Sequence, residues 1–184
     1  MGAVRERTGR RALVPLGLGI AVAAGIYAFG TVHTPDYSGT GLFGRTALGT
    51  LSLKSWLATA VLGLAVLQLG TAMWLFRWIP RARRPPRRVA TVHRGLGAAA
   101  ILLTLPVAYH CMFAYGIQTF NARVAAHSFA GAFLYGAIVA KLTVVRWKSL
   151  PTWLLPLAGG TLVGLVALLW YTSALWYFQG MKLP

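Results

Sequence analysis

Five long apolar runs constrain the fold of this chain more than any other feature of its sequence. They cover about residues 12–32, 55–76, 89–117, 124–145 and 152–178. Each run reaches the ~20 residues that a helix needs to cross the ~30 Å hydrocarbon core of a bilayer. A helix is the structure in which such a run pairs all its own backbone groups within lipid. We therefore predict an all-α, polytopic membrane protein that is a bundle of five transmembrane helices.

The segments between these runs are short, which predicts a single transmembrane domain over residues 12–184. A basic tail of residues 1–11 precedes it, an outer loop covers residues 33–54, and a basic loop covers residues 77–88. The first run is long for the apolar part of a signal peptide, so we interpret it as a retained helix. Gly160 and Gly164 form a G-x-x-x-G motif in the fifth run. This motif permits close helix approach, either inside the monomer or in an oligomer.

Positive charge is distributed unevenly along the chain, which has 18 basic and 2 acidic residues. Most bases lie in residues 1–11, 77–94 and 146–148, which are alternate connections. Because cytoplasmic loops are enriched in Lys and Arg, we expect the N-terminus inside and the C-terminus outside. The bases form short clusters rather than one face, so no nucleic-acid partner is expected. Abundant Arg, Ala and Gly are typical of a bacterial source, which predicts the plasma membrane.

Several function classes are disfavoured by what the chain lacks. Its two carboxylates, Glu6 and Asp36, both lie outside the apolar runs. Proton pumps and cation-coupled transporters normally carry carboxylates at membrane depth. The sequence contains no G-x-G-x-x-G or Walker motif, and no Ser-His-acid set can be assembled. An acid–base enzyme that acts on a soluble substrate is therefore not expected.

Two histidines, His110 and His127, flank the short polar turn at residues 118–123. A turn this short predicts that the third and fourth helices are antiparallel neighbours. The helical rise places the two imidazoles about 10 Å and about 6 Å deep from the same side. Polar side chains at such depth are costly and usually functional. Two facing imidazoles can fill both axial positions of a haem iron, so we predict haem b with His110 and His127 as its metal ligands.

A second, inner haem site is conceivable around His93 and Lys141. Lys141 shares nearly one helix face with His127, about 20 Å further along the axis. A ligating lysine must first lose its proton, so Lys141 would more simply snorkel to the surface or pair with a propionate. Arg94 could also bind a propionate or mark the interface. His33 could compete for the outer iron or lie among the headgroups. The cofactor count is therefore one haem, or two.

The sequence is also compatible with two other functions. His110, Cys111 and Met112 offer ligands that suit copper, although consecutive helical side chains point about 100° apart. A copper site would instead combine His33, His110 and His127. In a non-redox membrane subunit or scaffold, the histidines would form hydrogen bonds between helices.

The pattern His93-Arg94-x-x-Gly97, followed by His110 and His127, resembles the haem-bearing helices of the cytochrome b561 and ferric-reductase-like membrane families. The resemblance covers about residues 89–146. It implies helices that hold two b haems through four histidines and pass electrons across the membrane.

This chain departs from that pattern because its second run offers Gln68 in place of a histidine. The inner pair also lacks a second histidine unless Lys141 replaces it. The whole chain is also similar to uncharacterised five-span proteins of actinobacteria that carry the motifs PVAYHC (residues 106–111) and LWYTSALW (residues 169–176). Together these likenesses imply a cytochrome-like electron carrier, conceivably the haem-bearing subunit of an oxidoreductase. A redox protein or a quinone would be its partner.

Overall fold

The computed structural model describes residues 2–36, 41–81, 83–147 and 150–182, with side chains described from residue 13 onward. Every regular element in these ranges is a helix, and five helices are long and apolar enough to cross a membrane. The predicted all-α fold with five such helices is therefore confirmed. The helices are α1 (Gly2–Val32), η1 (Leu42–Gly44), α2 (Ala47–Leu75), α3 (Arg87–Ala114), α4 (Ala122–Arg146), α5 (Leu154–Trp170), η2 (Tyr171–Leu175) and α6 (Trp176–Phe178).

The second helix begins well before the expected residue 55. Thr46 is its N-cap, and the Thr46 side chain accepts a hydrogen bond from the Gly49 amide at 3.2 Å. Such a cap satisfies one of the backbone donors that the first helical turn leaves unpaired. As a consequence Lys54, which the sequence placed in the outer loop, lies inside α2.

The third helix ends at Ala114, earlier than the expected residue 117. Gly116 has a φ of 64°, and its amide donates to the Met112 carbonyl at 3.1 Å. This is a left-handed helix termination that favours glycine. The amide of Ile117 then donates to the Gly30 carbonyl at 2.9 Å, which fastens the turn after α3 to the end of α1.

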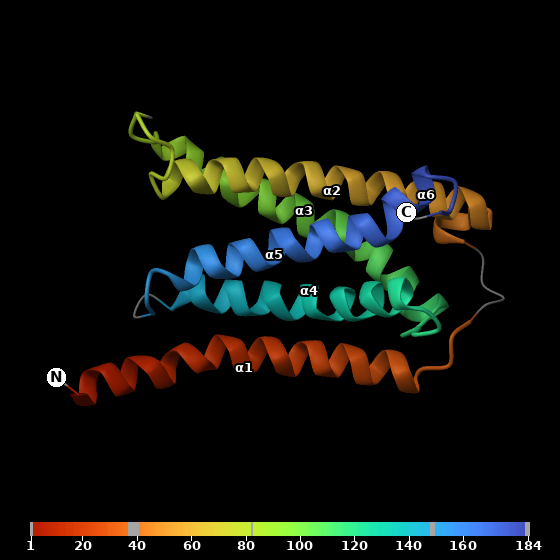
Figure 1. The fold of residues 1–184 in the computed structure, drawn as a ribbon, viewed down its shortest axis with the longest axis horizontal. Coiled ribbons are helices and arrows are strands. Elements are labelled where there is room, and N and C mark those ends of the chain that lie inside the picture. Colours follow the sequence, from red (N-terminus) through yellow and green to blue (C-terminus); the bar gives the residue numbers. More distant parts are fainter. Residues whose placement is uncertain (1, 37–40, 82, 148–149, 183–184) are drawn as a thin grey trace.

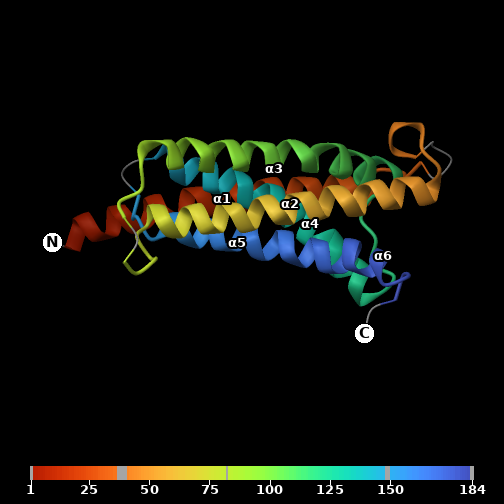
Figure 2. The same ribbon diagram turned by 90° about the horizontal axis from the view of Figure 1, so that it is seen from above.

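The order of the helices in the chain is not their order in space (Figures 1 and 2). The closely packed pairs are α1 with α4, α2 with α3, α4 with α5, and α2 with α5. The expectation that the third and fourth helices pack directly against each other is wrong. They run antiparallel from their short turn, but α3 crosses obliquely towards α2 while α4 lies between α1 and α5.

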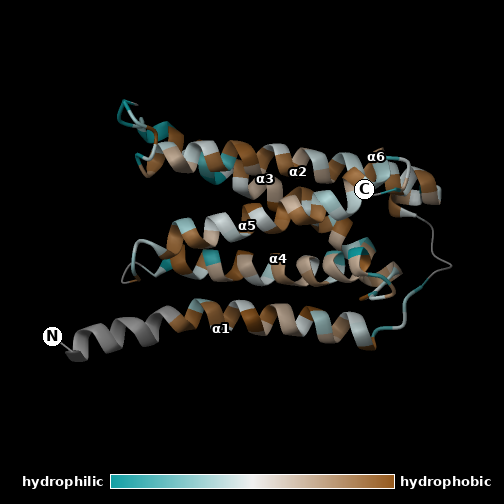
Figure 3. Cartoon of the chain, in the orientation of Figure 1, coloured by the Kyte–Doolittle hydropathy of each residue, from teal (hydrophilic) through white to brown (hydrophobic). Residues whose placement is uncertain are grey.

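The polar segments gather at the two ends of the bundle, and the helices between them are mostly apolar (Figure 3). The N-terminus, the α2–α3 connection and the α4–α5 connection lie at one end. The segment after α1, the α3–α4 turn and the C-terminus lie at the other. Gly160 and Gly164 have open space around them, so packing inside the monomer does not use the G-x-x-x-G motif of α5.

Candidate functional site

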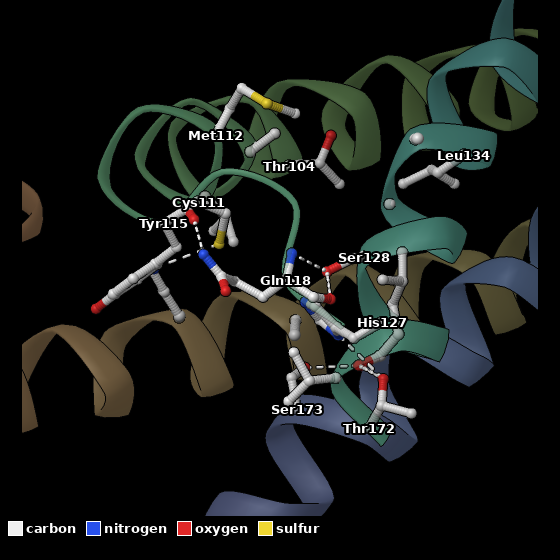
Figure 4. A pocket seen from close by; sticks show the side chains of 18 of the residues that line it. Thr104, Cys111, Met112, Tyr115, Gln118, His127, Ser128, Leu134, Thr172 and Ser173 are labelled. Carbon is white, nitrogen blue, oxygen red and sulfur yellow. Dashed lines mark hydrogen bonds between the residues drawn. The ribbon is translucent and has the colours of Figure 1, made fainter. Parts of the chain in front are cut away.

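A cavity of about 900 Å³ opens where α3 and α4 diverge. Residues from all five long helices line it, and most of its wall is apolar. Tyr135 of α4 reaches across the gap, and its hydroxyl donates to Thr104 of α3 at 3.1 Å. His127 lies near the α3–α4 turn (Figure 4). The charged side chains of the wall are at the same end, because Lys54 contacts Cys111 near the end of α3 and Arg123 lies in the first turn of α4. The cavity is thus apolar along most of its length and polar at one end.

His127 projects from α4 into this polar end, and its orientation is set by one neighbour. Its Nδ1 lies 3.0 Å from the Thr172 hydroxyl. That hydroxyl also lies 2.7 Å from the Leu168 carbonyl, to which only the hydroxyl can donate. The hydroxyl therefore accepts from His127, which assigns the imidazole proton to Nδ1. Nε2 then carries the lone pair of the neutral ring.

Thr172 lies in η2, a single π-helical segment that interrupts the last transmembrane helix. Such segments are rare and occur frequently at functional sites. Arg123 of α4 donates to the Thr172 carbonyl at 2.7 Å, and its guanidinium lies 4.1 Å from the ring centroid of Trp176. Both polar groups of Thr172 are therefore bonded to α4. Thr172 and Arg123 were not predicted as site residues, although Thr172 falls inside the LWYTSALW motif.

Lys54 lies at the same end of the cavity, close to the end of α3. Its ammonium is 3.3 Å from the Cys111 sulfur and 4.9 Å from the ring centroid of Tyr115. Partial burial, and secondarily the charge of Cys111, raises the pKa of the Tyr115 phenol above its usual value of 10.0. Lys54 is near enough to His110 and His127 to act electrostatically on both. No carboxylate is among the described residues of the wall, so this end carries uncompensated positive charge.

The imidazoles of His110 and His127, the predicted pair of ligands, do not both line this cavity. His110 is not among the residues that line the cavity, whereas His127 is. The His110 ring instead packs edge-on against Tyr115 with ring centroids 5.6 Å apart, and its buried Nδ1 has no hydrogen-bond partner in the part of the chain that the structure describes. The reason is the rotation of α3, which turns Cys111 and Met112 towards the cavity.

His33 does not line the cavity either. Its ring stacks on Phe29 at 5.2 Å and meets the edge of Phe113 at 5.2 Å. Its Nε2 is buried and has no hydrogen-bond partner among the residues described. The described residues contain no group of three His, Cys, Asp or Glu that could hold a metal ion. The expected copper set of His33, His110 and His127 is therefore not assembled.

The residues of the predicted inner site do not line this cavity. His93 Nδ1 is 2.8 Å from the Thr71 hydroxyl, and the His93 carbonyl accepts from the Gln68 amide at 2.6 Å. Lys141 is near enough to act electrostatically on His93. Arg94 is exposed. The Gln68 side chain of α2 thus binds the backbone of α3.

Comparison with known proteins places the chain in a family without assigning it an activity. One family model, described as a family of unknown function, matches residues 12–184. No curated protein matches the chain. No solved structure matches it either.

Proposed function

We propose that this chain, which belongs to the family of unknown function DUF6529, is a membrane protein that binds one haem b and carries electrons. The observation that carries this proposal is His127, which lines a large, mostly apolar cavity and whose Nδ1–H is bonded to Thr172, so that the lone pair lies on Nε2. A neutral imidazole with Nδ1–H held by a hydrogen bond is the form that ligates a metal through Nε2.

The cavity fits a haem in three respects. Its volume of about 900 Å³ falls within the range of cofactor and ligand pockets. Its apolar wall suits a macrocycle, and Lys54 and Arg123 supply two cations for two propionates. When bound, haem supplies a one-electron redox couple whose potential depends on ligands, burial and nearby charge. In this proposal the protein orients His127, excludes water and sets the local charge.

His127 is the residue that would hold the haem iron in this cavity, and His110 does not line it. His110 would become a second ligand only by leaving its contact with Tyr115. The inner residues His93 and Lys141 are not part of the cavity wall. One haem is therefore better supported than two.

The membrane setting belongs to the same proposal. The five apolar helices favour a multi-pass protein, and the arginine-rich segments share one end of the bundle. The positive-inside rule then assigns that end, with the N-terminus, to the cytoplasm of a bacterial cell. The sequence carries no flavin or nicotinamide motif, so a quinone or a second redox protein would supply or accept the electron.

A non-redox scaffold is the second candidate, and one specific observation favours it. His127 bonds to Thr172, and His93 bonds to Thr71, so each histidine joins two helices. Hydrogen bonds of this kind hold membrane helices together without any cofactor. In that case the purified protein would be colourless.

A reduced-minus-oxidised absorbance spectrum of the detergent-solubilised protein separates these candidates. We expect a Soret and an α band in the wild type, their loss in His127→Ala, and their retention in His93→Ala, the matched control. If His110→Ala also loses the bands, both axial positions are histidines. A colourless wild type would support the scaffold. A stoichiometric copper content would favour a metal site that this geometry does not predict.

A further inference from the structure

Residues at the end of α2 and in the connection to α3 line a second, smaller cavity that is open to the surface, at the opposite end of the bundle from the α3–α4 turn. Its volume is about 290 Å³. Three of its lining residues are arginines, and the others are an indole, a proline and an isoleucine. The complete set is Trp74, Arg77, Ile79, Pro80, Arg81 and Arg83.

This cavity is formed by a specific backbone path rather than by an extended loop. The indole Nε1 of Trp74 donates to the Arg83 carbonyl at 2.9 Å, which folds the connection back onto the end of α2. Arg77 and Arg81 have φ angles of 59° and 60°. The left-handed region is uncommon for residues other than glycine, so such positions are maintained by their surroundings. The two reversals bring three arginines around one space.

The positive charge of this cavity has no described counter-charge nearby. The sequence holds only two carboxylates, Glu6 and Asp36. The Asp36 amide donates to the Phe113 carbonyl at 3.2 Å, which places this residue at the other end of the bundle. Guanidinium groups bind phosphate oxygens through paired N–H donors, and tryptophan side chains favour the level of lipid headgroups. An anion with several acceptor oxygens is the ligand that this lining complements.

We propose that the Arg77–Arg81–Arg83 cavity binds a phosphate group, and that an anionic phospholipid supplies it as its headgroup. The inference is independent of haem, because it uses neither His127 nor the larger cavity. It differs from the general attraction of basic loops to anionic membranes, which depends on charge alone. Binding in this cavity should instead depend on the particular arginines that line it.

Two charge-matched variants distinguish these cases. The cavity variant combines Arg77→Gln, Arg81→Gln and Arg83→Gln. The control variant combines Arg84→Gln, Arg87→Gln and Arg88→Gln, which removes equal charge from exposed neighbours outside the cavity. A third variant replaces the cavity arginines by lysine, which keeps the charge and removes the paired donors. Helical circular dichroism and a melting curve for each variant report whether the fold is retained.

The probe is short-chain phosphatidylglycerol titrated onto the detergent-solubilised full chain, with phosphatidylcholine and inorganic phosphate as parallel arms. We expect the cavity variant to weaken phosphatidylglycerol binding by about tenfold or more, and the control variant by about threefold or less. The lysine variant should also weaken it by more than the control. Inorganic phosphate that binds as tightly as the lipid would support the cavity with free phosphate as its ligand. Equal losses in the cavity and control variants, equal binding of phosphatidylcholine, or no binding to the wild type would each overturn the proposal.

Discussion

Thr172 fixes the orientation of two side chains of α4, His127 and Arg123, at the polar end of the large cavity. Its hydroxyl donates to the Leu168 carbonyl and accepts from His127, so the proton on the imidazole is assigned by a neighbour. Its carbonyl accepts from Arg123. Outer hydrogen bonds of this kind set the orientation and basicity of a metal-binding histidine.

Replacing Thr172 by valine tests that role, because valine keeps the shape of threonine and lacks the hydroxyl. Under the haem proposal we expect haem affinity to fall by about tenfold or more and the midpoint potential to shift. Haem titration and potentiometry measure the two quantities. Thr161→Val is the matched control, since Thr161 makes the same hydroxyl bond, to the Leu157 carbonyl at 3.0 Å, at an exposed position of α5. The two variants behaving alike would argue that Thr172 has no positioning role.

At the scale of elements, α1 is held to α4 by the close approach of two glycines. A Cβ added at Gly19 would lie 2.8 Å from the Gly136 carbonyl oxygen and 3.1 Å from the Ala140 methyl group. Small residues permit such contact between membrane helices, where packing replaces the hydrophobic effect as the driving force. This contact places α1 against α4 and leaves α3 free to diverge.

Substitution of Gly19 by valine should therefore separate α1 from α4. We expect it to lower the free energy of unfolding by about 1–3 kcal/mol, the usual cost of overpacking. Gly17→Val, two residues earlier on α1, meets nothing within 4 Å and should change the unfolding free energy by about 0.5 kcal/mol or less. Unfolding in mixed micelles with increasing sodium dodecyl sulfate measures both. A larger loss in the Gly17 variant would contradict this account of the contact.

At the scale of the whole molecule, the uneven charge predicts an orientation in the membrane. The basic segments share one end of the bundle, and the C-terminus lies at the other. Because lysine- and arginine-rich segments remain in the cytoplasm, the proposed orientation exposes the C-terminus outside. This expectation depends on charge and does not depend on any cofactor.

Single cysteines report that orientation directly. In a Cys111→Ser background, Lys182→Cys should react with an impermeant maleimide in intact cells, and Arg84→Cys should react only after lysis. Both positions are exposed in the structure, so access depends on the membrane alone. Mass spectrometry of the purified protein quantifies the labelling. The reverse pattern would invert the orientation, and labelling of both in intact cells would exclude insertion as proposed.

Hydropathy along the chain predicts the helical fold, the five long apolar elements and approximate helix ends. These features depend on local properties, because hydropathy and the rise per residue are set within one segment. The sequence also identified His127, since an imidazole inside an apolar run is visible without any partner. Where it misjudged an end, a local signal was present: Thr46 caps α2, and Gly116 terminates α3.

Which helices are in contact, and which groups their side chains face, depends on the packing of the whole bundle. A short turn makes α3 and α4 antiparallel. They are nevertheless not closely packed, because α4 packs against α1 and α5. The rotation of α3 about its axis turns Cys111 to the cavity and His110 to Tyr115. The bond between His127 and Thr172 joins residues 45 positions apart. Helix rotation and crossing depend on the packing of the whole bundle, so periodicity within one segment does not contain them.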